Sequence, residues 1–199
     1  MATVTELHIY PIKSCAGIPV PEAKFTISGL VAQGVHDREW MLVTREGQFL
    51  TQREYPRMAL ITPRIDGDAV EVSAPGMPPL RLPLAQDPLA ADMTVQVWDH
   101  SVAAADCGDT AAGWFADAIQ APCRLVRFRP DVHRPTSTKW TGGTGGLPAE
   151  TRFADGYPIL VIGQASLDDL NARLQAAGRA PLPMNRFRPN LVVGGIEAF

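Results

Sequence analysis

The sequence predicts a mainly β (α+β) protein with two helices, and three observations lead to this class. Short apolar segments separated by turn residues fill about the first ninety of the 199 residues. Two later stretches repeat apolar residues at helical spacing. The last stretch, residues 185–195, is basic and proline-punctuated and runs into an apolar strand. Many short strands at regular spacing favour a small barrel or sandwich.

The predicted strands alternate with tight turns. Glu46-Gly47 and Asp66-Gly67-Asp68 should each join two strands, because glycine beside an acidic residue favours a hairpin turn. Up to the first helix, strands are expected at residues 7–10, 25–27, 39–43, 48–51, 59–62, 69–72, 80–84 and 95–98.

The first helix is predicted over residues 109–120. There Ala112, Phe115 and Ile119 recur on one face, and Asp109 is the expected N-cap. A proline two residues beyond the end agrees with a helix stop.

The second helix is predicted over residues 166–177. Ser166 and Asp169 are expected to form a capping box at its start, and Gly178 to occupy the position just after its end. The apolar segment 157–162 before it predicts a buried strand.

Between the helices, residues 124–128 predict a strand, and residues 130–150 predict a mobile loop. This loop contains the glycine-rich run 142–146. The run lacks the Lys-Ser/Thr pair of a Walker loop and is not a GxGxxG after a strand, so a flexible loop is favoured over a phosphate site.

Composition and charge exclude several classes of protein. The chain is 46% hydrophobic with a net charge of −3, whereas a general nucleic-acid binder is usually strongly basic. No apolar run is long enough to cross a bilayer, and the first residues lack the features of a signal peptide. We therefore expect a cytoplasmic protein that binds neither nucleic acid nor membranes.

The cysteines and histidines predict no metal site. Cys15, Cys107 and Cys123 are odd in number and irregularly spaced, so they form neither a disulfide framework nor a zinc motif. The four histidines are scattered without HxH or HxxxH spacing. Cys107 precedes a helix, which could lower its thiol pKa, but a small packing residue is the favoured interpretation.

Basic residues at predicted strand ends are the best candidates for ligand binding. Guanidinium groups together with hydroxyl and backbone donors suit a phosphate or another polyoxo anion. For any one of them, spacing alone favours a solvated surface side chain. The candidates, with one serine among them, are Lys13, Ser14, Arg38, Arg53, Arg186 and Arg188.

At these residues the sequence resembles the MOSC family, preceded by its MOSC N-terminal β-barrel domain. It is particularly similar to the mitochondrial amidoxime-reducing component and its bacterial relatives. Several motifs in the same order carry the resemblance, among them Tyr10–Cys15, Asp37–Trp40, Leu50–Arg53, Asp106–Asp109, Ala165–Asn171 and Arg186–Asn190.

The resemblance implies a pyranopterin molybdenum cofactor held between two domains. The matching family positions imply that Lys13, Ser14 and Arg38 contact it from the N-terminal domain. They imply that Arg188 and Asn190 contact it from the MOSC domain. Lysine and arginine would stabilise its phosphate, and the asparagine amide would pair with the pterin edge.

The resemblance also implies a domain division. An N-terminal β-barrel-like domain is expected over residues 1–90, and connecting strands, a helix and the glycine-rich loop over 91–150. The beginning of an incomplete MOSC barrel follows over 151–199. The family's molybdenum-ligating cysteine lies downstream of the Arg-Pro-Asn strand, so the chain is interpreted as the N-terminal piece of a longer protein. No residue present is expected to be catalytic or to ligate metal.

The function implied is the cofactor-binding portion of an oxidoreductase that reduces N-hydroxylated compounds. Molybdenum would take up the substrate oxygen, and a partner flavin or iron–sulfur protein would return electrons. One alternative is a cofactor- or sulfur-carrier module working with a pyridoxal-phosphate-dependent sulfurtransferase, which requires a reactive cysteine. Another is an interaction fragment without a ligand.

Overall fold

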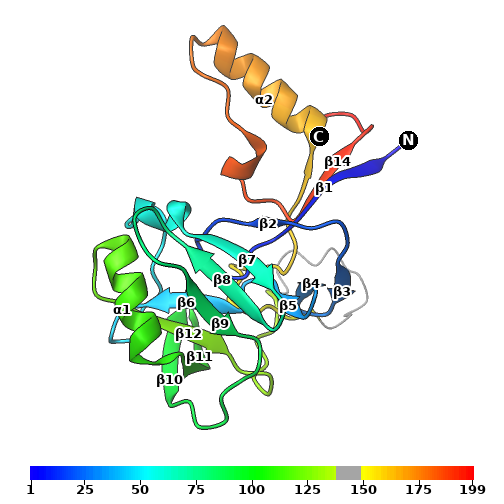
Figure 1. Ribbon diagram of the computed structural model, residues 1–199. Helices are drawn as coiled ribbons and strands as arrows, with labels where there is room; N and C mark the ends of the chain where they lie inside the picture. Colours follow the sequence, from blue (N-terminus) through cyan, green and yellow to red (C-terminus); the bar gives the residue numbers. More distant parts are fainter. Residues whose placement is uncertain (138–148) are drawn as a thin grey trace.

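The computed structural model describes residues 1–137 and 149–199 and confirms a mainly β fold with two helices (Figure 1). The helices are α1 (Gly108–Ile119) and α2 (Gln164–Ala176), with short 3-10 helices η1 (Pro56–Leu60) and η3 (Met184–Arg186). The strands of the first half are β1 (Thr3–Ile9), β2 (Ile18–Pro19), β3 (Lys24–Thr26), β4 (Gly29–Ala32), β5 (Val35–His36), β6 (Trp40–Val43), β7 (Thr62–Asp66), β8 (Ala69–Ser73) and β9 (Leu80–Pro83). Those of the second half are β10 (Asp92–Val97), β11 (His100–Asp106), β12 (Arg124–Phe128), β13 (Val161–Gly163) and β14 (Leu191–Gly194).

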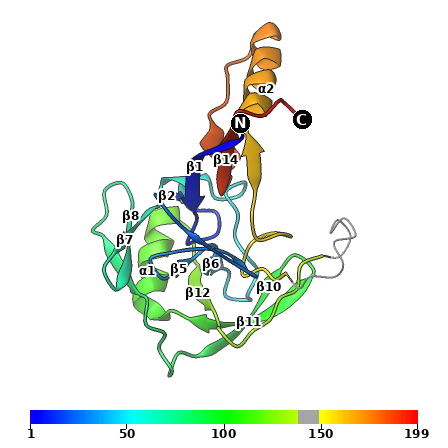
Figure 2. The same ribbon diagram turned by 90° about the vertical axis from the view of Figure 1, so that its right-hand side faces the viewer.

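Within the described ranges these strands form four small sheets. Their orders are β13-β14-β1-β2, β10-β11-β12-β6, β3-β4-β5 and β7-β8-β9. The main apolar core contains Trp40, Leu42, Phe115 and Leu125, so the sheet of β6 and β12 packs against α1. Figures 1 and 2 both show α2 and β14 standing away from the sheets of the first half, with β1 reaching out to join them.

The predicted hairpin at Asp66-Gly67-Asp68 is confirmed. Strands β7 and β8 pair in antiparallel register down to Asp66 opposite Ala69, and Gly67 adopts the left-handed φ of 60° that such a turn needs. The first strand begins later than predicted, however. Residues 56–60 form η1 instead, because Pro56 stands at its start and favours a helical first turn.

The predicted hairpin partner at residues 48–51 is confirmed in part. Phe49 bridges Val43 of β6 in antiparallel direction, and backbone hydrogen bonds join Thr44 N to Gln48 O at 2.8 Å and Leu50 N to Leu42 O at 2.9 Å. The segment forms no regular strand, however, and Gln48 also bridges Gln96 of β10. The turn between the two segments packs against β10, since a Cβ on Gly47 would lie 2.4 Å from the carbonyl oxygen of Thr94.

The first helix is confirmed within one residue, but its predicted cap is wrong. Cys107 occupies the N-cap position without a side-chain hydrogen bond. Asp109 lies in the first turn, where its carboxylate pairs with Arg124 at 3.1 Å. The positive end of the helix dipole also stabilises the negative charge of Asp109.

The second helix begins two residues before its predicted start, and the predicted capping box is wrong. Gly163 is the N-cap, and Asp169 instead pairs with Arg173 one turn later at 2.7 Å. Gly178 does follow the helix end with a left-handed φ of 69°, as predicted.

The segment predicted as a buried strand at residues 157–162 is largely exposed. Only Val161–Gly163 form a strand, β13, and Val161 is 56% exposed. Within the described residues, β13 pairs on one side only, parallel to β14. It is thus an edge strand among the described elements, whereas β14 has partners on both sides, β13 and β1.

The predicted glycine-rich loop run at 142–146 lies outside the described residues. On either side of that gap, Pro135 and Glu150 form an isolated bridge. Among the described helices, none has the length and apolar character needed to span a membrane.

Candidate functional site

A cavity of about 660 Å³ lies where loops from distant parts of the sequence meet. The structure brings all five predicted binding residues to its lining: Lys13, Ser14, Arg38, Arg188 and Asn190. The loop after β1 supplies the first two, and the segment before β14 supplies the last two. The volume is typical of a small-molecule site.

Backbone strain concentrates around this cavity. Ser14, Arg38 and Arg188 adopt left-handed φ angles of 67°, 48° and 59°, and so does Trp98 at 52°. These four are more than half of the seven described non-glycine residues with positive φ, and all four line the cavity. Each such residue costs on the order of 1–3 kcal/mol, and such strain clusters at functional sites.

Lys13 is buried but not free. Its Nζ donates to the Phe153 carbonyl at 2.8 Å and to Asp155 Oδ1 at 2.5 Å. Burial lowers the pKa of Lys13, and the Asp155 carboxylate opposes that shift. The indole of Trp98 donates to the same Oδ1 at 2.9 Å. An anion that approaches Lys13 must therefore compete with Asp155.

Arg38 is fixed by a buried carboxylate. Its guanidinium donates to Asp37 Oδ2 at 2.5 Å and to Asn190 Oδ1 at 3.1 Å. Asp37 is 2% exposed and also accepts the backbone N–H of Tyr10 at 2.8 Å. The direction of the Arg38 side chain is thus set before any ligand binds.

Arg188 has no carboxylate partner within ion-pair distance among the described residues. Its guanidinium donates to the Cys15 carbonyl and lies 4.4 Å from the Tyr10 ring centroid, as does that of Arg38. Burial lowers the pKa of Arg188 to about 10, and the nearby Arg38 charge adds to the effect. The guanidinium remains charged at neutral pH. The cavity therefore contains a positive charge that no carboxylate of the described residues balances.

Asn190 is fully engaged inside the chain. Its Nδ2 donates to the His8 carbonyl at 3.1 Å and to Asp37 Oδ1 at 2.9 Å. Its Oδ1 accepts from Arg38 and from the Leu160 backbone N–H, both at 3.1 Å. The side chain therefore ties β14 to β1 and orients Arg38. Direct contact of Asn190 with a cofactor stays a prediction.

The sequence reasoning did not identify Trp98. This residue sits at the tip of the β10–β11 hairpin, is 46% exposed and packs edge-on against Phe49 with ring centroids 5.0 Å apart. The signal in the sequence that could have identified Trp98 as a site residue is a large aromatic side chain in a tight turn. Gln52, part of a quoted motif, also contributes, since its amide donates to the Ser14 carbonyl at 2.6 Å.

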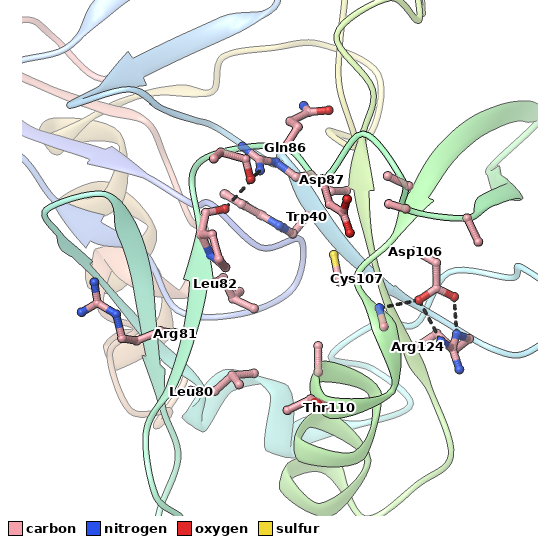
Figure 3. Close-up of a pocket in the computed structure, with 18 residues that line it drawn as sticks. Trp40, Leu80, Arg81, Leu82, Gln86, Asp87, Asp106, Cys107, Thr110 and Arg124 are labelled. Carbon is pink, nitrogen blue, oxygen red and sulfur yellow. Dashed lines mark hydrogen bonds and ion pairs between the residues drawn. The ribbon is translucent and has the colours of Figure 1, made fainter.

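A second pocket, of about 460 Å³, lies between β9, β11 and the start of α1 (Figure 3). Trp40 and Cys107 line it, and the Arg124–Asp106 ion pair stands at one side. It contains none of the five predicted binding residues.

Comparison with known proteins gives the same family twice along the chain. Residues 1–122 match the MOSC N-terminal beta barrel domain, and residues 148–199 match the MOSC domain. The domain boundaries predicted from the sequence are not tested by these matches and stay a prediction.

The chain is also similar to curated proteins over its whole length. It is 34% identical over 200 residues to the human mitochondrial amidoxime-reducing component 1 and 37% identical over 201 residues to the rat mitochondrial amidoxime reducing component 2. It spans 58% of the length of each. A solution structure of a Bordetella bronchiseptica protein is 25% identical, with a TM-score of 0.51 over 62% of this chain and 89% of that one.

Proposed function

Because this chain belongs to the MOSC family, with the MOSC N-terminal beta barrel domain followed by a MOSC domain, we propose that its basic cavity binds the pyranopterin molybdenum cofactor. The observation that carries the proposal is Arg188. Its backbone is strained, and its guanidinium is largely desolvated and has no carboxylate partner among the described residues. Such a buried charge costs free energy unless an anion binds beside it.

The donor set fits an anionic, phosphate-bearing ligand. Among the described residues, one carboxylate lines the cavity, that of Asp155, against five cationic side chains: Lys13, Arg38, Arg53, Arg186 and Arg188. Guanidinium forks bind phosphate oxygens in pairs, which gives direction as well as charge. The half-buried Ser14 adds a hydroxyl at the same end.

The proposed roles of the five residues differ. Arg188 and Lys13 hold the anionic end of the cofactor, and Ser14 donates a hydrogen bond to it. Arg38 adds positive charge, and its hydrogen bond to Asp37 at 2.5 Å fixes the direction of its guanidinium. Asn190 acts as a positioning residue, because its amide is already used to hold Arg38 and β1.

The proposed activity of the protein is reduction of N-hydroxylated compounds. Two similar proteins carry the name amidoxime-reducing component, which supports this substrate class. Bound molybdenum would supply oxygen-atom transfer from the substrate, and an electron-donor flavin or iron–sulfur protein would restore its electrons. The chain's own residues anchor and orient the cofactor.

The sulfur-carrier alternative requires a nucleophilic cysteine, and the three thiols do not suit that role. Burial raises the pKa of Cys15 and Cys107 to about 12 and that of Cys123 to about 11. A thiolate is the reactive form, so each remains in its unreactive form near neutral pH.

The test measures cofactor retention rather than turnover. The full chain is incubated with molybdenum cofactor released from a donor molybdoenzyme and then desalted, and bound pterin is quantified by fluorescence after oxidation. We expect Arg188→Glu to lose at least about tenfold in retained pterin, since attraction to the phosphate becomes repulsion. The matched control is Arg45→Glu, an exposed arginine that does not line the cavity.

Circular dichroism establishes that each variant is folded before retention is compared. If Arg188→Glu retains as much pterin as Arg45→Glu, the cavity is not the cofactor site. If the unmodified chain retains none, the proposal fails for this chain.

A further inference from the structure

The pocket beside α1 (Figure 3) differs in chemistry from the basic cavity, and the two share no lining residue. We propose that it is a second ligand site. The site would bind a compact, neutral and largely apolar molecule with one hydrogen-bond acceptor. That acceptor would accept a hydrogen bond from the indole N–H of Trp40.

The walls of this pocket are apolar and come from three elements. Leu82 on β9, Ala105 on β11 and Ala111 on α1 line it, and each is at most 7% exposed. The small alanine side chains leave the space that larger residues would fill, and the volume of about 460 Å³ accommodates a substituted aromatic ring.

The cations at this pocket are already paired within the chain. Arg127 donates to Glu39 at 2.8 Å and to the backbone carbonyls of residues 83–85. Arg124 is held by Asp106 and by a second carboxylate on α1, and Arg81 pairs with Asp66 and Asp68. Among the described residues no unpaired cation attracts an anion here, and the carboxylate of Asp87 at the rim, which forms no ion pair with them, would repel one, so a neutral ligand is favoured.

Trp40 supplies the polar contact. It is 1% exposed, and no hydrogen bond of its indole Nε1 is found among residues 1–137 and 149–199. This nitrogen is not one of the fully buried polar atoms without a partner, which agrees with Trp40 lining an open pocket. The indoles of Trp98 and Trp114 both have an acceptor, at 2.9 and 2.7 Å. Buried tryptophan N–H groups usually have a partner. An acceptor on a ligand in the pocket would provide it.

Cys107 supports the same ligand chemistry. In Figure 3 its sulfur and the Trp40 indole both point into the pocket. Burial raises the pKa of the Cys107 thiol to about 12, so it stays an uncharged S–H group at neutral pH. It adds a weak donor and no negative charge.

The pocket has a way in from solvent. Ala85, Asp87 and Ala91 belong to its lining and are exposed, so the segment between β9 and β10 forms its rim. A substitution on this rim can close the entrance without disturbing the buried core.

The experiment follows the indole N–H resonance of Trp40 in the ¹⁵N-labelled full chain, assigned by its loss in Trp40→Phe. Acetophenone is the probe, because it joins an apolar ring to one carbonyl acceptor. We expect a saturable shift of this resonance. Ethylbenzene, which lacks the acceptor, should bind roughly tenfold more weakly, and benzoate should produce no shift because its charge has no partner there.

Three variants locate the binding. Ala91→Phe narrows the rim and Ala105→Met fills the interior, and each should weaken acetophenone binding at least about tenfold. Ala177→Phe, on an exposed residue after α2, should leave binding unchanged. Ala91→Phe keeps the test valid if Ala105→Met does not fold.

Three results would each overturn the inference. They are the absence of a saturable shift at Trp40, equal affinity for acetophenone and ethylbenzene, and unchanged binding in a folded Ala91→Phe variant. None of them bears on cofactor retention in the basic cavity, so the two proposals fail separately.

Discussion

At the scale of single residues, the free energy of unfolding should depend strongly on one buried ion pair beside the core. Glu39 and Arg127 are 2% and 8% exposed and lie 2.8 Å apart. The Arg127 guanidinium also lies 4.7 Å from the Trp40 ring centroid. Removing Arg127 leaves the buried Glu39 carboxylate with only the more distant Arg152, at 3.9 Å, as a cationic partner among the described residues.

We therefore predict that Arg127→Met lowers the free energy of unfolding by about 3–5 kcal/mol, measured by urea denaturation. Arg64→Met is the control, because Arg64 pairs with Glu71 on an exposed surface, and such pairs contribute little. Equal urea midpoints for the two variants would show that the Glu39 carboxylate finds another partner.

The buried thiol of Cys15 makes a second residue-scale prediction, on pH. Its pKa rises from 9.0 to about 12 on folding because of burial. Between these values the unfolded chain has lost a proton that the folded chain keeps, so stability falls as pH rises. One proton corresponds to about 1.4 kcal/mol per pH unit.

The measurement is the urea midpoint from about pH 8 to about pH 11, for the chain and for Cys15→Ala. Cys15→Ala should be less stable throughout but should lose stability less steeply with rising pH. Parallel curves for the two proteins would contradict the shifted thiol pKa.

At the scale of elements, helix α1 contains a glycine without structural need. Gly113 lies in mid-helix and is exposed, and a Cβ added there would meet no atom within 4 Å. Gly113→Ala should raise the free energy of unfolding by about 1 kcal/mol, since alanine loses less backbone entropy in a helix.

The comparison variant is Gly108→Ala in the first turn of the same helix. Gly108 has a φ of 86°, which L residues rarely adopt, so this variant should be destabilised. The two changes are chemically identical. A thermal midpoint that moves the same way in both would exclude the conformational explanation.

The elements also show what local sequence pattern can predict. Periodic apolar residues placed α1 within one residue, and the Asp-Gly-Asp turn located the β7–β8 hairpin. The predicted cap of α1 failed because of a tertiary contact: the Asp109 carboxylate pairs with Arg124. β13 is apolar but lies at a sheet edge, where pattern alone suggests burial.

At the scale of the whole molecule, a net charge of −3 coexists with a cavity to which the described part of the chain contributes five cations and one carboxylate. The sequence placed lysine and arginine at predicted strand ends, and the resemblance to the MOSC family is what singled out the five binding candidates. The sequence could not show that β1–β14 pairing brings Lys13 to Arg188, nor that Ser14 and Arg188 have left-handed φ angles. It also could not show that Asn190 is used internally.

The concentrated charge predicts a salt-sensitive response to anions. Inorganic phosphate should raise the melting temperature at low ionic strength, and the increase should fade as sodium chloride reaches about 1 M, where charges are screened beyond about 3 Å. Arg188→Glu should show a smaller increase at low salt. A phosphate effect that is equal in the variant would place the anion elsewhere.

The pairing of the first strand with the last has a consequence for biosynthesis. Thr5 of β1 donates its hydroxyl hydrogen bond to Val192, 187 residues away, and Arg38 reaches Asn190 across 152 residues. On the ribosome, β1 and the Lys13 loop are made first. The end of β1 can pair with β2, but residues 3–7 have no strand partner until β14 emerges. The basic cavity is thus completed late in folding. A nascent chain that still lacks residues 186–190 lacks Arg188 and Asn190, which the segment before β14 contributes to the cavity.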